Sequence, residues 1–224
     1  YVDGVHYTAH HLPDPATLGA DFYVCSPYKF LGPHCGVLAA DPALLETIAI
    51  DKLLPATNVV PERFEFGTLS YEIMAGATAA VDFLAAIAPG AATTRRERLA
   101  SSFAAIDTHE TRLRWRLEEG LAALGDDVVL HSRAGHRTPT LFVTMPGRAT
   151  ADACAYLLTH NVLAPAGTFY AYEPYARLQA QLHLADTGGL RMGLAPYTTD
   201  AEVDRLLAGL AEFVGVPPDR VTNL

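Results

Sequence analysis

The chain has 224 residues, half of them apolar, and its 16 basic and 25 acidic residues give a formal net charge of −9. This length and apolar content allow one large domain or two smaller domains with hydrophobic cores. The acidic balance argues against nucleic acid as a partner, because it cannot neutralise phosphates in bulk. No apolar run reaches the roughly 20 residues of a membrane helix, so we also expect no membrane partner.

The first part of the chain alternates short apolar strands with helical stretches. Predicted strands cover 1–8, 21–26 and 36–40, and predicted helices cover 15–20, 42–50 and 70–88. Asp14 and Ser70 are the expected N-caps. Strands that alternate with helices predict an α/β layer with a mostly parallel sheet. Because the chain begins at Tyr1, without a methionine and inside a predicted strand, we expect an N-terminally truncated fragment.

A break at Pro89-Gly90-Ala91 separates this part from a long helical stretch, 94–124, which Gly125 ends. Beyond it, predicted strands cover 128–130, 140–145 and 189–194, a short segment covers 162–165, and predicted helices cover 150–160 and 199–214. This tail is typical of a smaller α+β domain. We therefore expect an α/β part over 1–90, a connecting helix over 91–125, and a small C-terminal domain over 126–224.

The cysteines indicate the compartment. The chain has three cysteines, which are widely spaced and odd in number. Such a set is typical of free thiols in a reducing environment, so we expect a cytoplasmic protein. They are Cys25, Cys35 and Cys154. The sequence contains no CxxC pair of the kind that binds zinc. The adjacent His10 and His11 lack supporting acidic or cysteine spacing, so we expect a hydrogen-bonded loop there and no metal.

Lys29 is the most informative residue, because it lies between an apolar strand and the Gly32-Pro33 turn. A lysine in such a place can be desolvated, which lowers its pKa and makes it an amine nucleophile toward a carbonyl. Asp3 ends another apolar segment. A carboxylate and a lysine on neighbouring strand ends suggest pyridoxal phosphate, with the lysine as Schiff base and the carboxylate on the pyridinium nitrogen. The alternative for Asp3 is a turn residue beside Gly4.

Two further side chains near these positions could contact such a cofactor. His6 shares a site with Asp3 only if the strand ends between them, which Gly4 permits, and it would touch the cofactor ring or its oxygen. The alternative is a surface histidine. Ser26 offers a hydroxyl to a phosphate at a strand end, although Ser-Pro is also a common turn.

Candidate ligand contacts recur later in the chain. Gly67 allows close backbone approach, and Thr68 offers a hydroxyl and an N–H to a phosphate just before the predicted helix. The alternative is a loop and a helix cap. Arg191 lies inside an apolar strand and needs a partner, for which its planar guanidinium suits a substrate carboxylate. The alternative is a salt bridge between domains.

Taken in order, these segments resemble the class V aminotransferase family of fold-type I pyridoxal phosphate enzymes, especially its cysteine-desulfurase-like branch. The segments that carry the resemblance are Asp3-Gly4-Val5-His6, the run 21–33 around Lys29, Arg63-Phe64-Glu65-Phe66-Gly67-Thr68, and Leu190-Arg191-Met192-Gly193-Leu194. The separation of 26 residues between Asp3 and Lys29 matches the spacing in that family.

The resemblance implies roles for the residues around the lysine. Lys29 would be the Schiff-base lysine and the proton shuttle, and Asp3 the pyridinium partner. His6 falls where family members place Gln or His against the cofactor hydroxyl. Ser26 would bind phosphate. Tyr28 stands where desulfurases often carry His, and it could still donate a hydrogen bond to the phosphate.

The resemblance also implies an architecture. Residues 1–90 would be the C-terminal part of a pyridoxal phosphate transferase large domain, with a mostly parallel sheet and flanking helices, followed by the smaller α+β domain. Gly67 and Thr68 would reach the phosphate of the neighbouring subunit, so a homodimer with shared active sites is expected. Arg191 would hold the carboxylate of a small amino-acid substrate.

Two departures from the family pattern leave the reaction open. Desulfurases need a mobile-loop cysteine, and the matching stretch 163–170 has none, while Cys154 lies upstream on a predicted helix where we expect it buried. The first half of the large domain is also absent from the sequence. The interpretations left open are a cysteine-desulfurase-like enzyme, a lyase, aminotransferase or epimerase without persulfide chemistry, and a non-catalytic protein on a degenerate fold.

Overall fold

The computed structural model describes residues 1–131, 134–185 and 188–222, and the chain divides into two units, Tyr1–Asp107 and Thr108–Leu224. Helix α4 (Arg95–Ala123) contributes residues to the hydrophobic cores of both units. The division at residues 90 and 125 stays a prediction. Within the described residues, no helix is long and apolar enough to cross a membrane.

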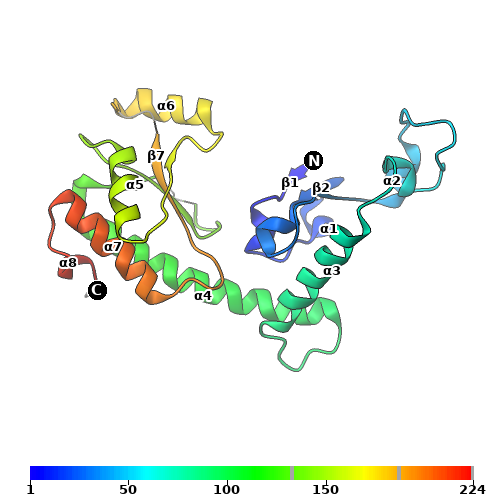
Figure 1. Ribbon diagram of the computed structural model, residues 1–224, viewed down its shortest axis with the longest axis horizontal. Coiled ribbons are helices and arrows are strands. Elements are labelled where there is room, and N and C mark those ends of the chain that lie inside the picture. The colour runs from blue at the N-terminus through cyan, green and yellow to red at the C-terminus, as the bar shows by residue number, and fades with distance from the viewer. Residues whose placement is uncertain (132–133, 186–187, 223–224) are drawn as a thin grey trace. The chain divides into compact units, whose positions relative to one another are not determined.

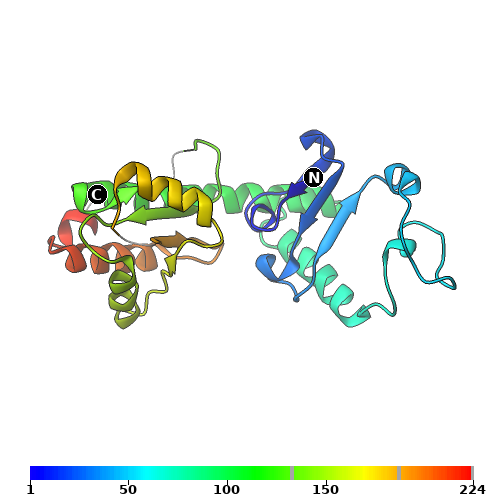
Figure 2. The same ribbon diagram turned by 90° about the horizontal axis from the view of Figure 1, so that it is seen from above.

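The first unit contains a three-stranded sheet in the order β1-β2-β3 (Figures 1 and 2). β1 (Val2–Asp3) runs parallel to β2 (Phe22–Cys25), whereas β3 (Val37–Ala40) runs antiparallel to β2. The predicted α/β fold is confirmed, with a mixed sheet in this unit. Its helical elements are η1 (Tyr7–Ala9), α1 (Pro15–Leu18), η2 (Pro27–Phe30), α2 (Pro42–Thr47), η3 (Glu62–Phe64) and α3 (Tyr71–Ala86).

The core of this unit holds the turn that follows β2. Its buried members come from η2, α3 and α4, and they are Phe30, Leu84, Phe103 and Ile106. Pro27 is also buried. Because a 3₁₀-helix has three residues per turn, positions 27 and 30 share its inner face. Tyr28 and Lys29 are left exposed.

The second unit contains an antiparallel sheet in the order β4-β5-β7-β6. The strands are β4 (Val129–Leu130), β5 (Thr140–Thr144), β6 (Ala166–Gly167) and β7 (Gly189–Gly193). The remaining helical elements are η4 (Gly125–Asp127), α5 (Thr150–Thr159), α6 (Tyr172–Leu182), α7 (Asp200–Val214) and α8 (Asp219–Thr222).

Alternation along β5 and β7 gives this sheet two different faces. One face supplies Leu141, Val143, Leu190 and Met192 to a core shared with α4, α5 and α7. The other face carries Phe142 and Arg191, which are register partners. Helix α6 lies over that second face, where the Tyr175 ring centroid is 6.0 Å from that of Phe142 (Figure 1).

Most of the predicted elements are present with boundaries shifted by a few residues. Asp14 caps α1 as predicted, since its Oδ1 accepts the Thr17 N–H at 3.2 Å. Ser70 stands at the N-cap of α3, but its side chain makes no capping bond. The short segment expected over 162–165 has no regular secondary structure, and the two-residue strand β6 (Ala166–Gly167) follows it. Helices α6 and α8 were not predicted.

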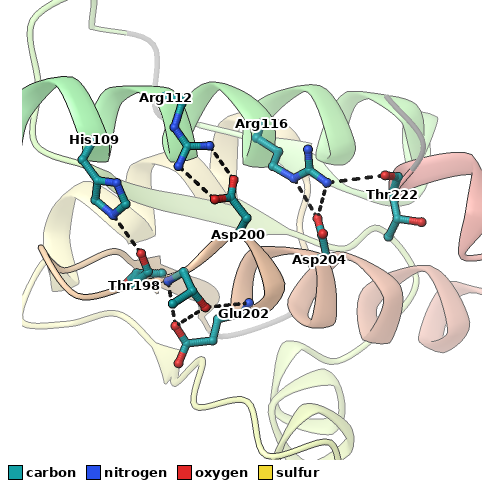
Figure 3. A network of polar contacts seen from close by, with 9 residues as sticks. His109, Arg112, Arg116, Thr198, Asp200, Glu202, Asp204 and Thr222 are labelled. Carbon is teal, nitrogen blue, oxygen red and sulfur yellow. Dashed lines mark hydrogen bonds and ion pairs between the residues drawn. The ribbon is translucent and has the colours of Figure 1, made fainter.

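A row of polar contacts joins α4 to α7 and to the loop before it (Figure 3). The contacts are His109 with the Thr198 carbonyl, Arg112 with Asp200, and Arg116 with Asp204. A capping box between Thr199 and Glu202 fixes the start of α7 beside them. These contacts orient the helix that covers one face of the second sheet.

We expect Arg112→Ala to lower the free energy of unfolding at neutral pH and to have a smaller effect in acid. The Arg112 guanidinium lowers the pKa of Asp200 below its ordinary value of 3.8 through hydrogen bonding. A carboxylate with a lowered folded-state pKa stabilises the fold above its unfolded pKa, and this stabilisation is lost as pH falls through the folded pKa. The difference in unfolding free energy between wild type and variant should therefore close below pH 3.8 in urea titrations.

The matched control is Arg177→Ala, which removes an exposed pair with Glu173 on α6. Pairs of this kind contribute little, so we expect no measurable change in stability. A destabilisation by Arg112→Ala that is independent of pH would contradict the role assigned to Asp200.

Candidate functional site

The parallel pair β1 and β2 brings Asp3 and Lys29 to the same edge of the first sheet. Asp3 ends β1 and is in register with Val24 on β2, so both strands end at one edge. β2 ends at Cys25, and η2 carries Lys29 immediately beyond it. The Asp3 carboxylate is exposed, and its Oδ1 accepts the Val5 N–H at 2.9 Å. An acid and an amine thus follow neighbouring strand ends.

Lys29 itself is exposed, so the described residues do not desolvate it as the sequence had led us to expect. Its Nζ lies 5.8 Å from the centroid of the Tyr28 ring. Tyr28 in turn stacks on His34, with ring centroids 4.8 Å apart and planes 10° apart. Buried Phe30 anchors the backbone of this turn. The Lys29 amine is exposed and can meet a ligand from solvent.

His6 lies beyond the end of the first strand, as sharing a site with Asp3 requires. β1 ends at Asp3, and His6 takes the N-cap position of η1 in a helical conformation. The His6 ring is exposed and makes an edge contact with buried His10 at a centroid distance of 4.9 Å. The His10 N–H donates to the Tyr7 carbonyl, which agrees with the predicted hydrogen-bonded loop.

Ser26 occupies the N-cap of η2, yet its side chain makes no capping bond. Its hydroxyl is therefore not committed to the helix end. Groups of this kind at the start of a turn suit a phosphate oxygen.

Gly4 fills a position with no room for a side chain. The Gly4 N–H donates to the Val24 carbonyl at 2.9 Å, and the Gly4 carbonyl accepts the Thr8 hydroxyl at 2.8 Å. The Thr8 oxygen lies 2.8 Å from the Tyr23 hydroxyl, and burial raises the pKa of that phenol. This buried chain of bonds ties the turn after Asp3 to β2.

We expect Gly4→Ala to destabilise the fold by about 1–3 kcal/mol, because the added methyl would overlap the Tyr23 ring. Thermal or urea unfolding measures the change. The matched control is Gly36→Ala, where nothing lies within 4 Å of the added carbon. Equal stability of the two variants would show that Gly4 is not tightly enclosed.

Cys25 stands next to the candidate site but is poorly suited to nucleophilic chemistry. It is half-buried, and burial, with a smaller contribution from Cys35, raises the pKa of its thiol. A raised thiol pKa reduces the thiolate fraction at neutral pH. Cys154, expected to be buried, is half-buried on α5 and packs against the core of the second unit.

Gly67 and Thr68 lie in the loop between η3 and α3, and both are exposed. Gly67 has φ +78°, a conformation that glycine adopts readily. Upstream, Arg63 contacts Glu46 at 3.3 Å and donates to the Leu45 carbonyl, which ties η3 to α2. In both views, the segment between α2 and α3 stands apart from the three strands (Figures 1 and 2). Among the described residues, no hydrogen bond or ion pair joins Gly67 or Thr68 to Lys29.

Arg191 belongs to the second unit and is exposed on β7. Its guanidinium lies 4.3 Å from the centroid of the Phe169 ring. Among the described residues, it makes no ion pair with a carboxylate, so the salt bridge considered from the sequence is not seen. A guanidinium laid on an aromatic face can still bind a carboxylate with its N–H groups.

The loop that precedes α6 has an unusual backbone. Phe169 and Tyr170 both have positive φ, +52° and +66°, a conformation rare for residues other than glycine. Tyr170 is fully exposed. Within the described residues, no group of three or more histidine, cysteine or acidic side chains could hold a metal ion.

Comparison with known proteins identifies the family. The family described as aminotransferase class V matches residues 1–206. The chain belongs to the class V aminotransferase family. The resemblance found in the sequence is thereby confirmed, and members of this family are generally pyridoxal phosphate-dependent.

Relatives of this class V chain include a Mycobacterium tuberculosis protein without assigned function, 31% identical over 216 residues, with 95% of this chain and 52% of that protein covered. A cysteine desulfurase of Klebsiella pneumoniae is 32% identical over 222 residues, with 93% and 49% covered. The crystal structure of the cysteine desulfurase CsdA from Escherichia coli matches with a TM-score of 0.71 at 24% identity, over 96% of this chain and 51% of that one. The chain therefore spans about half the length of the relatives it matches.

The side chains at the edge of the first sheet fit the cofactor of the class V family. An amine at Lys29, a carboxylate at Asp3 and an uncommitted hydroxyl at Ser26 are the donors and acceptors that an aldehyde, a pyridine nitrogen and a phosphate require. Lys29 makes no ion pair among the described residues that would compete for its amine. Sequence reasoning missed the role of Phe30, which anchors the Lys29 turn in the core of the first unit, because a single aromatic residue in a short turn carries no local signal.

Proposed function

We propose that this chain is part of a pyridoxal phosphate-dependent enzyme that acts on an amino acid, with Lys29 as the Schiff-base lysine. The observation that carries the proposal is the placement of Asp3 at the end of β1 and of Lys29 just beyond the end of the adjacent parallel strand β2. Ligands of α/β proteins bind at the carboxyl ends of such strands.

Each residue of the site has a role that its chemistry allows. When bound, the cofactor supplies an electron sink for charge that develops at the substrate Cα. Lys29 Nζ would hold the cofactor covalently and would move the proton at Cα. Asp3, oriented by the Val5 N–H, would keep the pyridine nitrogen protonated. Ser26 and Tyr28 would donate hydrogen bonds to the phosphate.

The remaining two roles concern the cofactor hydroxyl and the substrate. His6 contacts the hydroxyl of the ring, which suits its position in the turn just after Asp3. Arg191 binds the substrate carboxylate through its planar guanidinium. No contact among the described residues already satisfies Arg191 with a carboxylate, which leaves it available for this purpose.

We propose a homodimer in which Gly67 and Thr68 bind the phosphate of the neighbouring subunit. The segment that contains them stands apart from its own sheet (Figure 1) and exposes large apolar side chains. These side chains are Leu53, Leu54, Val59 and Phe66. Exposed apolar patches of this kind mark interaction surfaces.

The absence of any paired cysteine among the described residues is consistent with the cytoplasmic location that we propose.

A second candidate is an enzyme that uses the same cofactor but performs no persulfide chemistry, namely a lyase, an aminotransferase or an epimerase. The specific observation in its favour is the loop over residues 163–170, which has no cysteine, together with half-buried Cys25 and Cys154. A non-catalytic protein on a degenerate fold is the least favoured interpretation, because Asp3, Lys29 and Arg191 are all present.

The test is borohydride reduction of the protein expressed from its whole coding sequence, followed by peptide mapping. We expect the cofactor mass on the peptide that contains Lys29, and a protein that never acquires it would refute the proposal. Product analysis then separates the two candidates. Persulfide on the enzyme indicates a desulfurase, whereas keto acid, free sulfide or racemised substrate indicates the second candidate.

A further inference from the structure

A cavity of about 280 Å³ lies in the second unit, between α6 and the sheet face that carries Arg191. Phe142 on β5 is the register partner of Arg191, so the two side chains lie next to each other on this face. Tyr175 and Leu178 on α6 line the opposite wall, and Phe169 closes one side. The cavity therefore opens beside the residue to which we assign the substrate carboxylate.

The walls of this cavity are aromatic and apolar. The Phe142 ring meets Phe169 and Tyr175 edge to face, at centroid distances of 6.3 and 6.0 Å. The Tyr175 hydroxyl donates to the Gly188 carbonyl at 2.8 Å, so it is already used and the ring presents apolar surface. The polar side chains at the wall, apart from Arg191, are the uncharged hydroxyls of Thr140 and Thr168.

Phe169 links the cavity to Arg191. Its ring lies 4.3 Å from the Arg191 guanidinium and also contacts Phe142. Its backbone has φ +52°, a conformation that bulky residues rarely adopt unless the surroundings impose it. Such strained positions cluster at ligand sites, and here the strain places the ring between a cation and an apolar wall.

We propose that this cavity takes the side chain of the amino-acid substrate, and that this side chain is apolar and of the size of leucine or phenylalanine. The inference rests on the proposed function, because Arg191 must hold the carboxylate for the side chain to enter the cavity. Apolar walls favour an apolar side chain through its transfer from water. A charged or strongly hydrogen-bonding side chain would lose its water partners without replacement.

The first experiment measures binding of carboxylates that lack an amine and cannot react with a cofactor aldehyde. Calorimetry on the protein expressed from its whole coding sequence compares 3-phenylpropanoate and 4-methylpentanoate with propanoate and 3-sulfanylpropanoate. We expect the two larger apolar acids to bind at least about tenfold more tightly than the two small ones. Equal affinity for all four would overturn the inference.

The second experiment changes the volume of the cavity. Leu178→Phe should fill it and lower the affinity for 3-phenylpropanoate by about tenfold, with a smaller effect on propanoate. Leu178→Ala should enlarge it and shift the preference toward the aromatic acid. The matched control is Leu182→Ala, which removes a leucine of the same helix that is 47% exposed and does not line this cavity. Identical effects of the changes at 178 and 182 would overturn the inference.

The two proposals fail in different ways. Cofactor trapped on Lys29 without any preference among the four acids would overturn the side-chain cavity and leave the enzyme proposal standing. A preference for the larger acids that depends on Leu178, without an adduct on Lys29, would support a site for apolar carboxylates and refute the pyridoxal phosphate chemistry.

Discussion

Replacement of Lys29 by alanine is expected to abolish the borohydride-trapped adduct and to lower turnover of the amino-acid substrate by at least about 10³-fold. In the proposed role the amine both carries the cofactor and moves the proton at Cα, so one substitution removes two functions. The side chain is exposed and its neighbours Pro27 and Phe30 hold the turn, so the fold should be preserved. Mass spectrometry of reduced protein and circular dichroism measure the two outcomes.

The chain offers a matched control, because it contains just two lysines, Lys29 and Lys52. The Lys52 amine donates to the Ala56 carbonyl at 2.7 Å, in the segment between α2 and α3. Lys52→Ala should keep the adduct and the turnover. An adduct that persists in Lys29→Ala, or one that moves to Lys52, would show that Lys29 is not the Schiff-base residue.

Replacement of Asp3 by asparagine is expected to lower turnover by about 10²–10³-fold while the cofactor can still be trapped on Lys29. An amide cannot hold a pyridine nitrogen in its protonated form, so the ring withdraws electrons less strongly. The amide oxygen of the substituted side chain can still accept the Val5 N–H that orients Asp3, which keeps the local turn. The cofactor absorbance spectrum and the rate together measure the effect.

Asp21→Asn serves as the control for this substitution, since Asp21 is an exposed acid just before β2 and its replacement removes the same charge from the same unit. It should leave the rate and the cofactor spectrum unchanged. If both variants lose activity equally, the loss comes from the net charge of the unit and Asp3 has no specific role.

Local patterns in the sequence predicted much of the fold. The long helix α4, the capped start of α1 and the final helix α7 follow from helical spacing and, for α1, from its N-cap residue. Helix α6 was missed, because Pro174 in its first turn and the polar residues around it conceal a short apolar face. Proline is tolerated there since the first N–H groups of a helix have no internal partner. β6 was not predicted, because a strand of two residues has no alternation to read.

The sequence by itself determined which chemical groups are present and in what order: a carboxylate at Asp3, an amine at Lys29, an arginine at 191, and no cysteine over residues 163–170. Residue type and spacing along the chain are local properties. Only the tertiary structure decided that Asp3 and the turn of Lys29 share one edge of a sheet, and that Phe169 and α6 enclose a cavity beside Arg191. These depend on strand register and on packing between residues far apart in the sequence, which no local pattern encodes.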